Sequence, residues 1–422
     1  MQEPITVCLD ARIHPGAMGG VEQYVSRLGR ALLDLNPPDQ RYVFLVHDAG
    51  AAWARAAIGP DARLLSLPAG RLGRGRIKKL RRRLKRAVSA VTRPLRRGVG
   101  IPDRVAPARS PGVIERAGVD LMHFTYQAGF LTAVPTVYQP HDVQHLHLPQ
   151  FFSPHEIRKR ETLYRAYCAA ARAVPVSSEW TRQDLIRQYG LPPDRVHAVQ
   201  YPPPHLDAPE PTPGQVADAR ARLGLPERFV YYAATTFAHK NHLGLLDAIA
   251  HLRDERGLAV PLVCSGKQTE HFALVQSRLS ALRLEPLVRF VGFVPAADVR
   301  AVYRAASAVV IPTRFESASF PLWEAMAEGV PVACSGVTSL PSQAGDAALL
   351  FDPASPAQIA EALARLWTDR ALGAALVAKA RARIAGFTAQ RAARTFHALY
   401  RVALGMEVTP EQRGLLHGGA IG

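Results

Sequence analysis

Residues 308–331 read AVVIPTRFESASFPLWEAMAEGVP, and this stretch decides the fold. Its first part is an apolar run that stops at Pro312, which favours a short buried strand of a parallel sheet. Pro321 suits the first turn of a helix, where a missing N–H costs little, and Gly329 suits the helix end. The stretch therefore predicts a strand, a loop of small residues and a short helix.

Two features of this segment predict chemistry. The loop Ser317-Ala318-Ser319-Phe320 meets a helix N-terminus, where free backbone N–H groups form an anion site that phosphate usually occupies. Glu316 and Glu324 would repel phosphate, but carboxylates accept hydrogen bonds well from the hydroxyl pairs of a ribose or a hexose. Together they indicate a nucleotide sugar. The spacing alone fits equally well a surface glutamate pair on an ordinary α/β unit.

The same segment, FESASFPLWEAMAEGVPV from residue 315, resembles the glutamate–seven residues–glutamate motif of family-four retaining glycosyltransferases, commonly YEGFGLPVLEAMACGTPV. The match has no gaps. The matching positions are Phe315, Glu316, Pro321, Glu324, Ala325, Met326, Gly329 and Pro331. Ser317 and Ser319 replace loop glycines. The resemblance implies that Glu316 contacts the transferred hexose and Glu324 the ribose, with Ser317, Ala318, Ser319, Phe320 and Leu322 also at the donor.

Length and composition indicate a globular chain of two domains. Its 422 residues are more than a single domain usually contains, and 48% of them are hydrophobic. No apolar run approaches the 18 residues of a membrane span, and the start MQEPITVCLDARIH lacks the pattern of a signal peptide. The four cysteines form no CxxC pair. We expect buried free thiols in a cytoplasmic protein.

The positive charge is concentrated in one segment. Arg71–Arg97 holds 13 basic residues, against a net charge of +17 for the whole chain, and residues 62–102 contain no Asp or Glu. Apolar residues recur there at steps of three and four, at Ile77, Leu80, Leu84, Val88, Val91 and Leu95. This pattern predicts a basic amphipathic helix on an anionic membrane surface. A solvated arginine-rich loop is the alternative; nucleic acid is disfavoured because no aromatics are interleaved.

Strands and helices alternate along the whole chain, which predicts parallel sheets. A proline-rich stretch, 201–214, separates two such alternations. We predict two doubly wound Rossmann-like α/β domains, 1–205 and 206–388, facing a central cleft. The resemblance, from about residue 6 to 386, implies the same GT-B arrangement. It also implies a C-terminal segment, 389–422, whose helix at Arg391–Leu404 crosses back to the first domain.

Further candidate residues follow predicted strands. Residues 233–242 read AATTFAHKNH, and Lys240 near a helix start would neutralise a diphosphate leaving group. Thr235 stands where the family often has a second cation. His141, in the sequence YQPHD, resembles the family's HD element and would bind the transferred sugar.

Glycines mark two more candidate positions. Gly19 and Gly20 match the family's first-loop glycines, while Gly266 and Lys267 follow a strand and are expected to shape the nucleotide pocket. There is no GxGxxG followed by a suitably placed acidic residue and no GxxxxGK[ST], which argues against a dehydrogenase or a P-loop enzyme. No DxD pair follows a strand, so we expect no metal and no cofactor.

These observations, with the resemblance, predict a metal-independent glycosyltransferase that moves a hexose to a growing lipid-linked glycan. The resemblance alone implies retention of configuration, and relatives with the HKN sequence suggest mannose from GDP-mannose as the first choice. The expected partners are a nucleotide sugar, a glycan or glycolipid acceptor and the anionic inner membrane surface, but no nucleic acid. The alternatives are another donor such as a UDP-sugar, a nucleotide-sugar-binding protein without turnover, and a nucleic-acid-binding protein.

Overall fold

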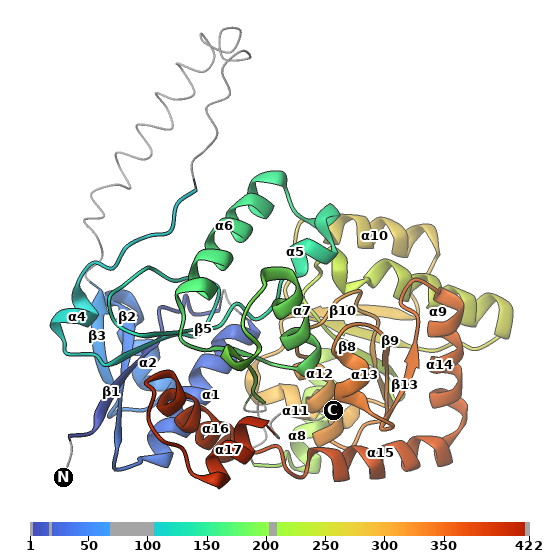
Figure 1. Ribbon diagram of the computed structural model, residues 1–422. Coiled ribbons are helices and arrows are strands. Elements are labelled where there is room, and N and C mark those ends of the chain that lie inside the picture. Colours follow the sequence, from blue (N-terminus) through green and yellow to red (C-terminus); the bar gives the residue numbers. More distant parts are fainter. Residues whose placement is uncertain (1–2, 17–18, 68–104, 202–208, 418–422) are drawn as a thin grey trace, which may run out of the picture. The chain divides into compact units, whose positions relative to one another are not determined.

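The computed structural model describes residues 3–16, 19–67, 105–201 and 209–417 (Figure 1). The chain divides into two compact units: one comprises residues 1–140 and 154–172, the other residues 141–153 and 173–422. The basic segment 71–97 lies outside the described residues. The domain boundaries predicted at residues 205 and 388 stay predictions.

The first unit is built on a five-stranded parallel sheet in the order β3-β2-β1-β4-β5. Its strands are β1 (Ile5–Asp10), β2 (Gln40–His47), β3 (Arg63–Leu67), β4 (Leu121–Phe124) and β5 (Thr136–Tyr138). Its helices are α1 (Gly20–Leu35), α2 (Ala51–Ala57), α4 (Val113–Arg116) and α6 (Pro154–Ala170). From β1 the chain builds the sheet to one side and then, from β4, to the other. The topological switch point therefore lies between β1 and β4.

The second unit contains a six-stranded parallel sheet in the order β10-β9-β8-β11-β12-β13. Its strands are β8 (Val230–Ala233), β9 (Leu262–Ser265), β10 (Val288–Gly292), β11 (Ala308–Ile311), β12 (Val332–Ser335) and β13 (Ala348–Phe351). The helices after the linker are α8 (Pro213–Leu223), α9 (His242–Arg256), α10 (Phe272–Ala281), α11 (Ala296–Ala305), α12 (Phe320–Ala327), α13 (Leu340–Ala344), α14 (Pro356–Thr368), α15 (Arg370–Ile384), α16 (Ala389–Ala403) and α17 (Pro410–His417). Here the switch point lies between β8 and β11.

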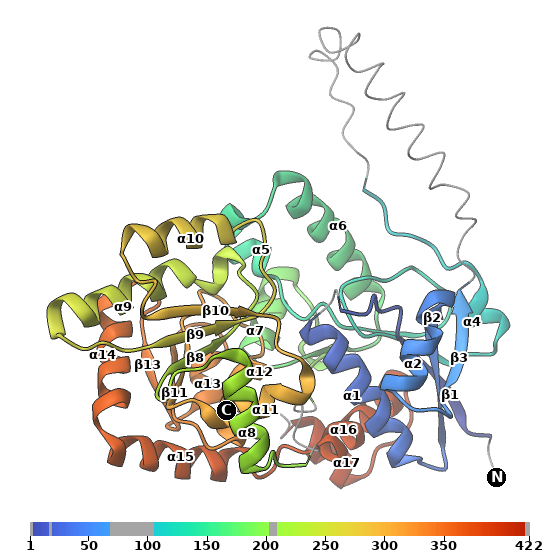
Figure 2. The ribbon, with the colours of Figure 1, turned by 180° about the vertical axis from the view of Figure 1, so that it is seen from behind.

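Helices cover both faces of this second sheet. Val230 and Val310 join one buried cluster with residues of α9 and α14, which run side by side in Figure 1. Tyr231, the next residue of β8, points to the opposite face and packs edge-on against Tyr303 of α11 at 5.0 Å between ring centroids. Figure 2 shows α8 and α11 together on that side. The alternation of side chains along buried strands thus fills two cores.

The second unit also takes elements that we expected in the first. They are α5 (Gln144–His147), β6 (Val174–Val176), α7 (Glu179–Tyr189) and β7 (Val196–Ala198). Strand β6 pairs in parallel with β7, and the two form a separate two-stranded sheet. The helix predicted at Arg391–Leu404 is α16, and its crossing to the first domain stays a prediction.

The predicted fold class, two parallel-sheet α/β units, is confirmed. The decisive segment folds as its sequence indicates: β11 is followed by a loop and by α12, with Pro321 in its first turn. Gly329 has a φ of 69°, and the Val330 amide donates to the Ala325 carbonyl at 2.9 Å, as at a glycine-capped helix end. Within the described residues, no helix is long and apolar enough to cross a bilayer.

Candidate active site

The two loops at the switch point of the second sheet bring the predicted lysine and glutamate together. Lys240 ends a 3₁₀ turn (Ala238–Lys240) after β8, and Glu316 lies in the loop after β11, the neighbouring strand. The Lys240 ammonium donates to Oε2 of Glu316 at 2.7 Å, and both side chains are largely buried. The carboxyl ends of neighbouring parallel strands meet at one sheet edge, which is why residues 76 positions apart form this pair.

The charge state of Glu316 reflects opposing influences. Burial raises the pKa of the Glu316 carboxyl, and the positive charge of Lys240 and its hydrogen bond oppose that shift. The Asp142 carboxylate raises it further, which places the predicted His141-Asp142 element within electrostatic reach of Glu316. The site therefore gathers one ammonium and two carboxylates in a desolvated setting.

The turn that carries Lys240 is held from three directions. The Tyr232 hydroxyl donates to the Lys240 carbonyl at 2.7 Å, and the Arg314 amide donates to the His239 carbonyl at 2.8 Å. Asn241, with a φ of 60°, donates its side-chain amide to the Pro353 carbonyl at 2.8 Å. These bonds fix the direction in which the lysine leaves the backbone.

Side chains that follow β12 support the loop of Glu316, and sequence reasoning did not single them out. The Thr338 hydroxyl donates to the Glu316 carbonyl at 2.6 Å and accepts from the Glu316 amide at 3.0 Å. The Ser339 hydroxyl donates to the same carbonyl at 2.7 Å. The sequence could have indicated them, because both follow a predicted strand, and the loops after neighbouring strands β11 and β12 meet at one sheet edge.

A side chain of α13 holds the small-residue loop, and sequence reasoning did not predict it. The Ser319 amide donates to the side-chain carbonyl of Gln343 at 3.0 Å. Gln343 also donates its side-chain N–H to the Ser317 carbonyl at 3.2 Å. The Leu322 side chain is fully buried. Donor contacts of Ser317, Ala318, Ser319, Phe320 and Leu322 stay predictions.

Glu324 projects from α12 towards α11. The hydroxyl of buried Tyr303 donates to Oε2 of Glu324 at 2.8 Å. Burial raises the pKa of Glu324 to about 7; the Tyr303 hydrogen bond lowers it, and the charge of Glu328 raises it. Tyr303 was missed because a tyrosine in an apolar helix stripe reads as core. The glutamates thus have different partners: Glu316 a cation, Glu324 a neutral hydroxyl.

His141 is buried and has an unusual backbone. Its φ is 66°, in the left-handed region that non-glycine residues seldom adopt, and its Nδ1 lies 3.0 Å from the Tyr201 hydroxyl. Nearby, Nε2 of partly exposed His147 lies 2.7 Å from the carboxylate of buried Asp184, and the His147 ring packs against Phe315 at 5.6 Å between centroids. The predicted HD element is therefore anchored beside the glutamate loop of the second unit.

The loop after β9 depends on a glycine. Gly266 has a φ of 126°, and a Cβ built there would lie 2.4 Å from the Ala234 carbonyl oxygen. Only glycine therefore allows the loops after β8 and β9 to approach this closely. Half-buried Thr235 follows Ala234, and exposed Lys267 accepts through its carbonyl from the Thr236 amide at 3.0 Å. The predicted role of this loop in shaping a nucleotide pocket is not tested.

The predicted glycine pair lies in the first unit. Gly19, with a φ of 50°, precedes α1, which begins at Gly20. Glu22 organises this loop by accepting from the Gly16 amide at 2.8 Å and from the Trp53 indole N–H at 2.9 Å. Sequence reasoning overlooked Glu22. In the described part of the chain, no group of three or more His, Cys, Asp and Glu side chains could hold a metal ion.

Comparisons with known proteins show which family this chain resembles. Residues 217–383 match the family model "Glycosyl transferases group 1", and residues 18–201 match "Glycosyltransferase Family 4". The O-antigen chain mannosyltransferase B of Escherichia coli is 29% identical over 214 residues, 50% of this chain and 56% of that protein. A D-inositol 3-phosphate glycosyltransferase of Xylanimonas cellulosilytica is 32% identical over 288 residues, 62% of this chain and 67% of that protein.

The solved structures agree on the fold. The sucrose-phosphate synthase of Thermosynechococcus elongatus superposes with a TM-score of 0.69 over 94% of this chain and 98% of its own, at 21% identity. This likeness shows the two-domain GT-B fold. The chain spans only 56–65% of the length of the curated relatives that it matches first.

Proposed function

Because this chain belongs to glycosyltransferase family 4, we propose that it transfers a hexose from a nucleoside diphosphate to an acceptor hydroxyl with retention of the anomeric configuration. The observation that carries this proposal is the ion pair between Lys240 and Glu316 at the switch point of the second sheet. The geometry offers a cation for a leaving diphosphate and a carboxylate for sugar hydroxyls, on neighbouring strands.

The pair has to separate when a donor binds. The diphosphate would take the Lys240 ammonium from Glu316, and the released carboxylate would accept hydrogen bonds from the hexose. Negative charge grows on the diphosphate as the glycosidic bond breaks, so Lys240 stabilises the transition state more than the bound donor. A diphosphate oxygen then accepts the proton of the attacking acceptor hydroxyl on the same face of the sugar.

Glu324 would bind the ribose of the nucleotide. An ionised carboxylate accepts two hydrogen bonds from neighbouring hydroxyls, and the Tyr303 hydroxyl holds Oε2 in place. His141 would contact the transferred sugar, oriented by the hydrogen bond between its Nδ1 and Tyr201. This division assigns sugar chemistry to Glu316 and nucleotide affinity to Glu324.

Mannose from GDP-mannose is the donor that we favour, because one relative is named an O-antigen chain mannosyltransferase. The acceptor in this proposal is a lipid-linked glycan, with the basic segment 71–97 holding the enzyme on an anionic cytoplasmic membrane surface. The metal-independent mechanism is part of the same proposal, with Lys240 in the place of a cation.

A panel of nucleotide sugars tests the function. Purified protein is incubated with GDP-mannose, UDP-glucose and UDP-N-acetylglucosamine, and release of nucleoside diphosphate is measured with and without chelator. We expect chelator-resistant turnover of one donor, and turnover that is lower by about 10²–10³-fold in the Glu316→Gln variant. Donor binding without turnover by the wild-type protein, even with mixed glycan acceptors, would instead establish a binding protein.

A further inference from the structure

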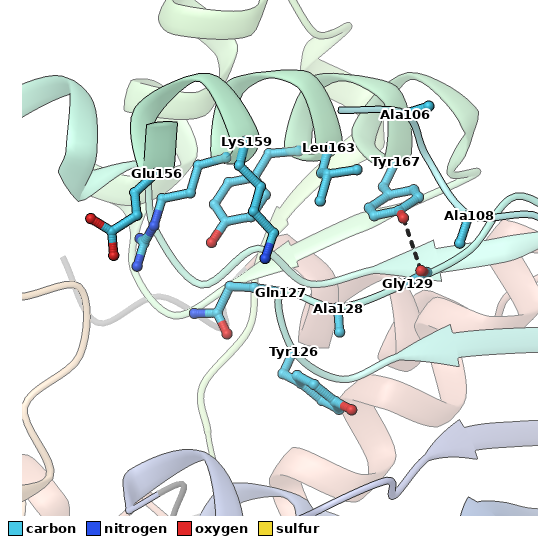
Figure 3. A pocket seen from close by; sticks show the side chains of 12 residues that line it. Ala106, Ala108, Tyr126, Gln127, Ala128, Gly129, Glu156, Lys159, Leu163 and Tyr167 are labelled. Atoms are coloured by element: carbon cyan, nitrogen blue, oxygen red, sulfur yellow. Dashed lines mark hydrogen bonds between the residues drawn. The ribbon is translucent and has the colours of Figure 1, made fainter. Parts of the chain in front are cut away.

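Side chains hold the backbone carbonyls of the loops at both switch points. Figure 3 shows the loop after β4 of the first unit, beside a cavity of about 570 Å³. Its Gly129 carbonyl accepts from the Tyr167 hydroxyl at 2.8 Å, and its Gln127 carbonyl accepts from the Tyr138 hydroxyl at 2.9 Å. The loop after β11 of the second unit is held in the same manner, by side chains from the segments that follow β6 and β12.

Two consecutive carbonyls of the loop after β11 accept two hydrogen bonds each. The Glu316 carbonyl accepts from the two hydroxyls that follow β12. The Ser317 carbonyl accepts from the Ser177 hydroxyl at 2.7 Å and from the side-chain N–H of Gln343 at 3.2 Å. Because a carbonyl oxygen has two lone pairs, both carbonyls are fully used and their directions are fixed.

The fixed carbonyls determine where the N–H groups of the loop point. In a planar trans peptide unit the C=O and the N–H point in opposite directions. The Ser317 and Ala318 amides belong to the two peptide units whose carbonyls are held, so each N–H points away from the donors of its own unit. Among the described residues, neither amide donates a hydrogen bond. Two consecutive N–H groups are thus presented just before α12 begins.

The Gln343 carboxamide joins three parts of this arrangement. Its Oε1 accepts from the Ser319 amide at 3.0 Å, and its Nε2 donates to the Ser317 carbonyl and, at 3.1 Å, to the Ser339 hydroxyl oxygen. Gln343, Ser319 and Ser339 are all buried. Water therefore does not compete for these bonds, and breaking them would leave buried polar groups without partners.

Helix α13, which carries Gln343, is fixed by an arginine of α15. The half-buried Arg383 guanidinium donates to the Gln343 carbonyl at 2.7 Å and to the Ser342 carbonyl. These carbonyls lie in the last turn of a five-residue helix, where they have no partner inside the helix. Arg383 thus fixes the point from which the Gln343 side chain reaches the loop.

We propose that Gln343 is a positioning residue for the transfer reaction: it holds residues 316–319 so that the Ser317 and Ala318 amides and the Glu316 carboxylate face one bound donor. Gln343 itself does not touch the donor. This inference rests on the proposed function, whereas the hold on the loop rests on the hydrogen bonds alone. A misplacement of the reacting groups by about 1 Å can cost about 10²-fold in rate, so the loop needs such a clamp.

Hydrogen exchange tests the hold on the loop. The full-length Gln343→Met variant, whose side chain is unbranched and apolar, is compared with the wild type by mass spectrometry of peptides that cover residues 312–326. The Ser319 amide loses its acceptor, so its exchange should become faster by about tenfold or more, while peptides from β8 and β9 stay unchanged. Unchanged exchange in the loop would overturn the proposal.

Kinetics separates positioning from stability. Gln343→Met should lower kcat by about 10–10²-fold. The Kd for GDP should change by less than about threefold, because Lys240 and Glu324 are untouched.

Gln40→Met is the matched control. Gln40 is a buried glutamine at the start of β2, whose side-chain oxygen accepts from the Tyr42 hydroxyl at 3.0 Å. This variant should lower the melting temperature while kcat stays within about twofold of the wild type. Equal loss of kcat in the two variants would leave Gln343 a structural role only and overturn the proposal.

A second variant of the same residue gives a pH signature. In Gln343→Glu the ionised carboxylate accepts from the Ser319 amide but cannot donate to the Ser317 carbonyl, whereas the protonated carboxyl regains one donor. Burial favours the protonated form, so the ratio of the variant's kcat to that of the wild type should rise as the pH falls from about 8 to about 6. A constant ratio would contradict the role of the donated bond. If the wild type turns over no donor, the proposed function fails, and exchange of the Ser319 amide still decides whether Gln343 holds the loop.

Discussion

The Lys240 ammonium and the Glu316 carboxylate lie 2.7 Å apart, on loops that follow two neighbouring strands of the second sheet. Each neutralises the other in a largely buried place, so removing one leaves a buried charge without its partner. In the proposed reaction the donor replaces this bond with two new ones, one for each residue. In this proposal the pair is a preformed binding site whose two charges are already largely removed from water.

The first prediction separates the two members of this pair. Glu316→Gln should lower turnover by about 10²–10³-fold while nucleotide diphosphate binding survives, because Lys240 is then released for the diphosphate. Lys240→Ala should lower turnover by a similar factor and also lower the melting temperature, since Glu316 stays buried and unpaired. Steady-state kinetics measures turnover, calorimetric titration with GDP measures nucleotide binding, and thermal unfolding gives the melting temperature. Lys379→Ala is the control, because this lysine of α15 forms a solvent-exposed ion pair with Asp346. Wild-type kinetics in both variants would contradict the assignment.

The second prediction concerns pH. The pKa of Glu324 is about 7 in the free protein, so the carboxylate gains a proton as the pH falls through 7. A protonated carboxyl accepts ribose hydroxyls less well, and nucleotide affinity should therefore fall between pH 8 and pH 6. Tyr303→Phe removes a hydrogen bond that lowers this pKa, so the midpoint should move to higher pH.

Titration calorimetry with GDP across this range measures the effect. Glu324→Gln is the control, because a side chain that does not titrate should remove the pH step together with much of the affinity. A pH step that persists in Glu324→Gln would assign the titration to another group.

The third prediction is structural. Gly266→Ala should destabilise the protein by about 1–3 kcal/mol, because the backbone at φ 126° disfavours a side chain and the new Cβ would meet the Ala234 carbonyl. Gly386→Ala, where an added Cβ meets nothing within 4 Å, should change stability by less than about 0.5 kcal/mol. Urea unfolding of the two variants compares them directly. Equal stability of the two variants would mean that the loop after β9 can move away from the Ala234 carbonyl without loss of folding free energy.

The fourth prediction concerns stereochemistry. The first product formed from an α-linked donor should be α-linked, as front-face displacement requires. Proton NMR of the product within the first turnovers reads the anomeric coupling before any spontaneous change. An inverted product would refute the proposed mechanism and leave the fold assignment untouched.

The fifth prediction concerns the basic segment 71–97 and rests on its sequence alone. Binding to vesicles should require anionic lipid and weaken with salt, since each Lys or Arg contributes about 1 kcal/mol near an anionic surface. Changing Leu80, Leu84 and Val88 to Ser keeps the net charge and should still weaken binding, because the apolar stripe is lost. Sedimentation with neutral and anionic vesicles decides, and equal binding to both would rule out the electrostatic part.

Local sequence determined the elements of this protein. Pro321 and Gly329 set the ends of α12 because one lacks an N–H and the other tolerates positive φ, properties that need no distant partner. Short apolar runs between helical patterns likewise indicated two parallel sheets. The ungapped resemblance of residues 315–332 to the family's motif implied a glycosyltransferase, which the spacing of Glu316 and Glu324 alone did not decide.

Tertiary structure alone decided which side chains meet. The order of the strands places Lys240 against Glu316, and the packing of α11 on α12 places Tyr303 on Glu324 and sets its pKa. The position of α13 likewise brings the side chain of Gln343 to the Ser319 amide, a contact that the sequence did not predict. Backbone preferences act over a few neighbouring residues, whereas these contacts join positions 21–76 apart, so they follow from how the sheet is assembled and not from any local pattern.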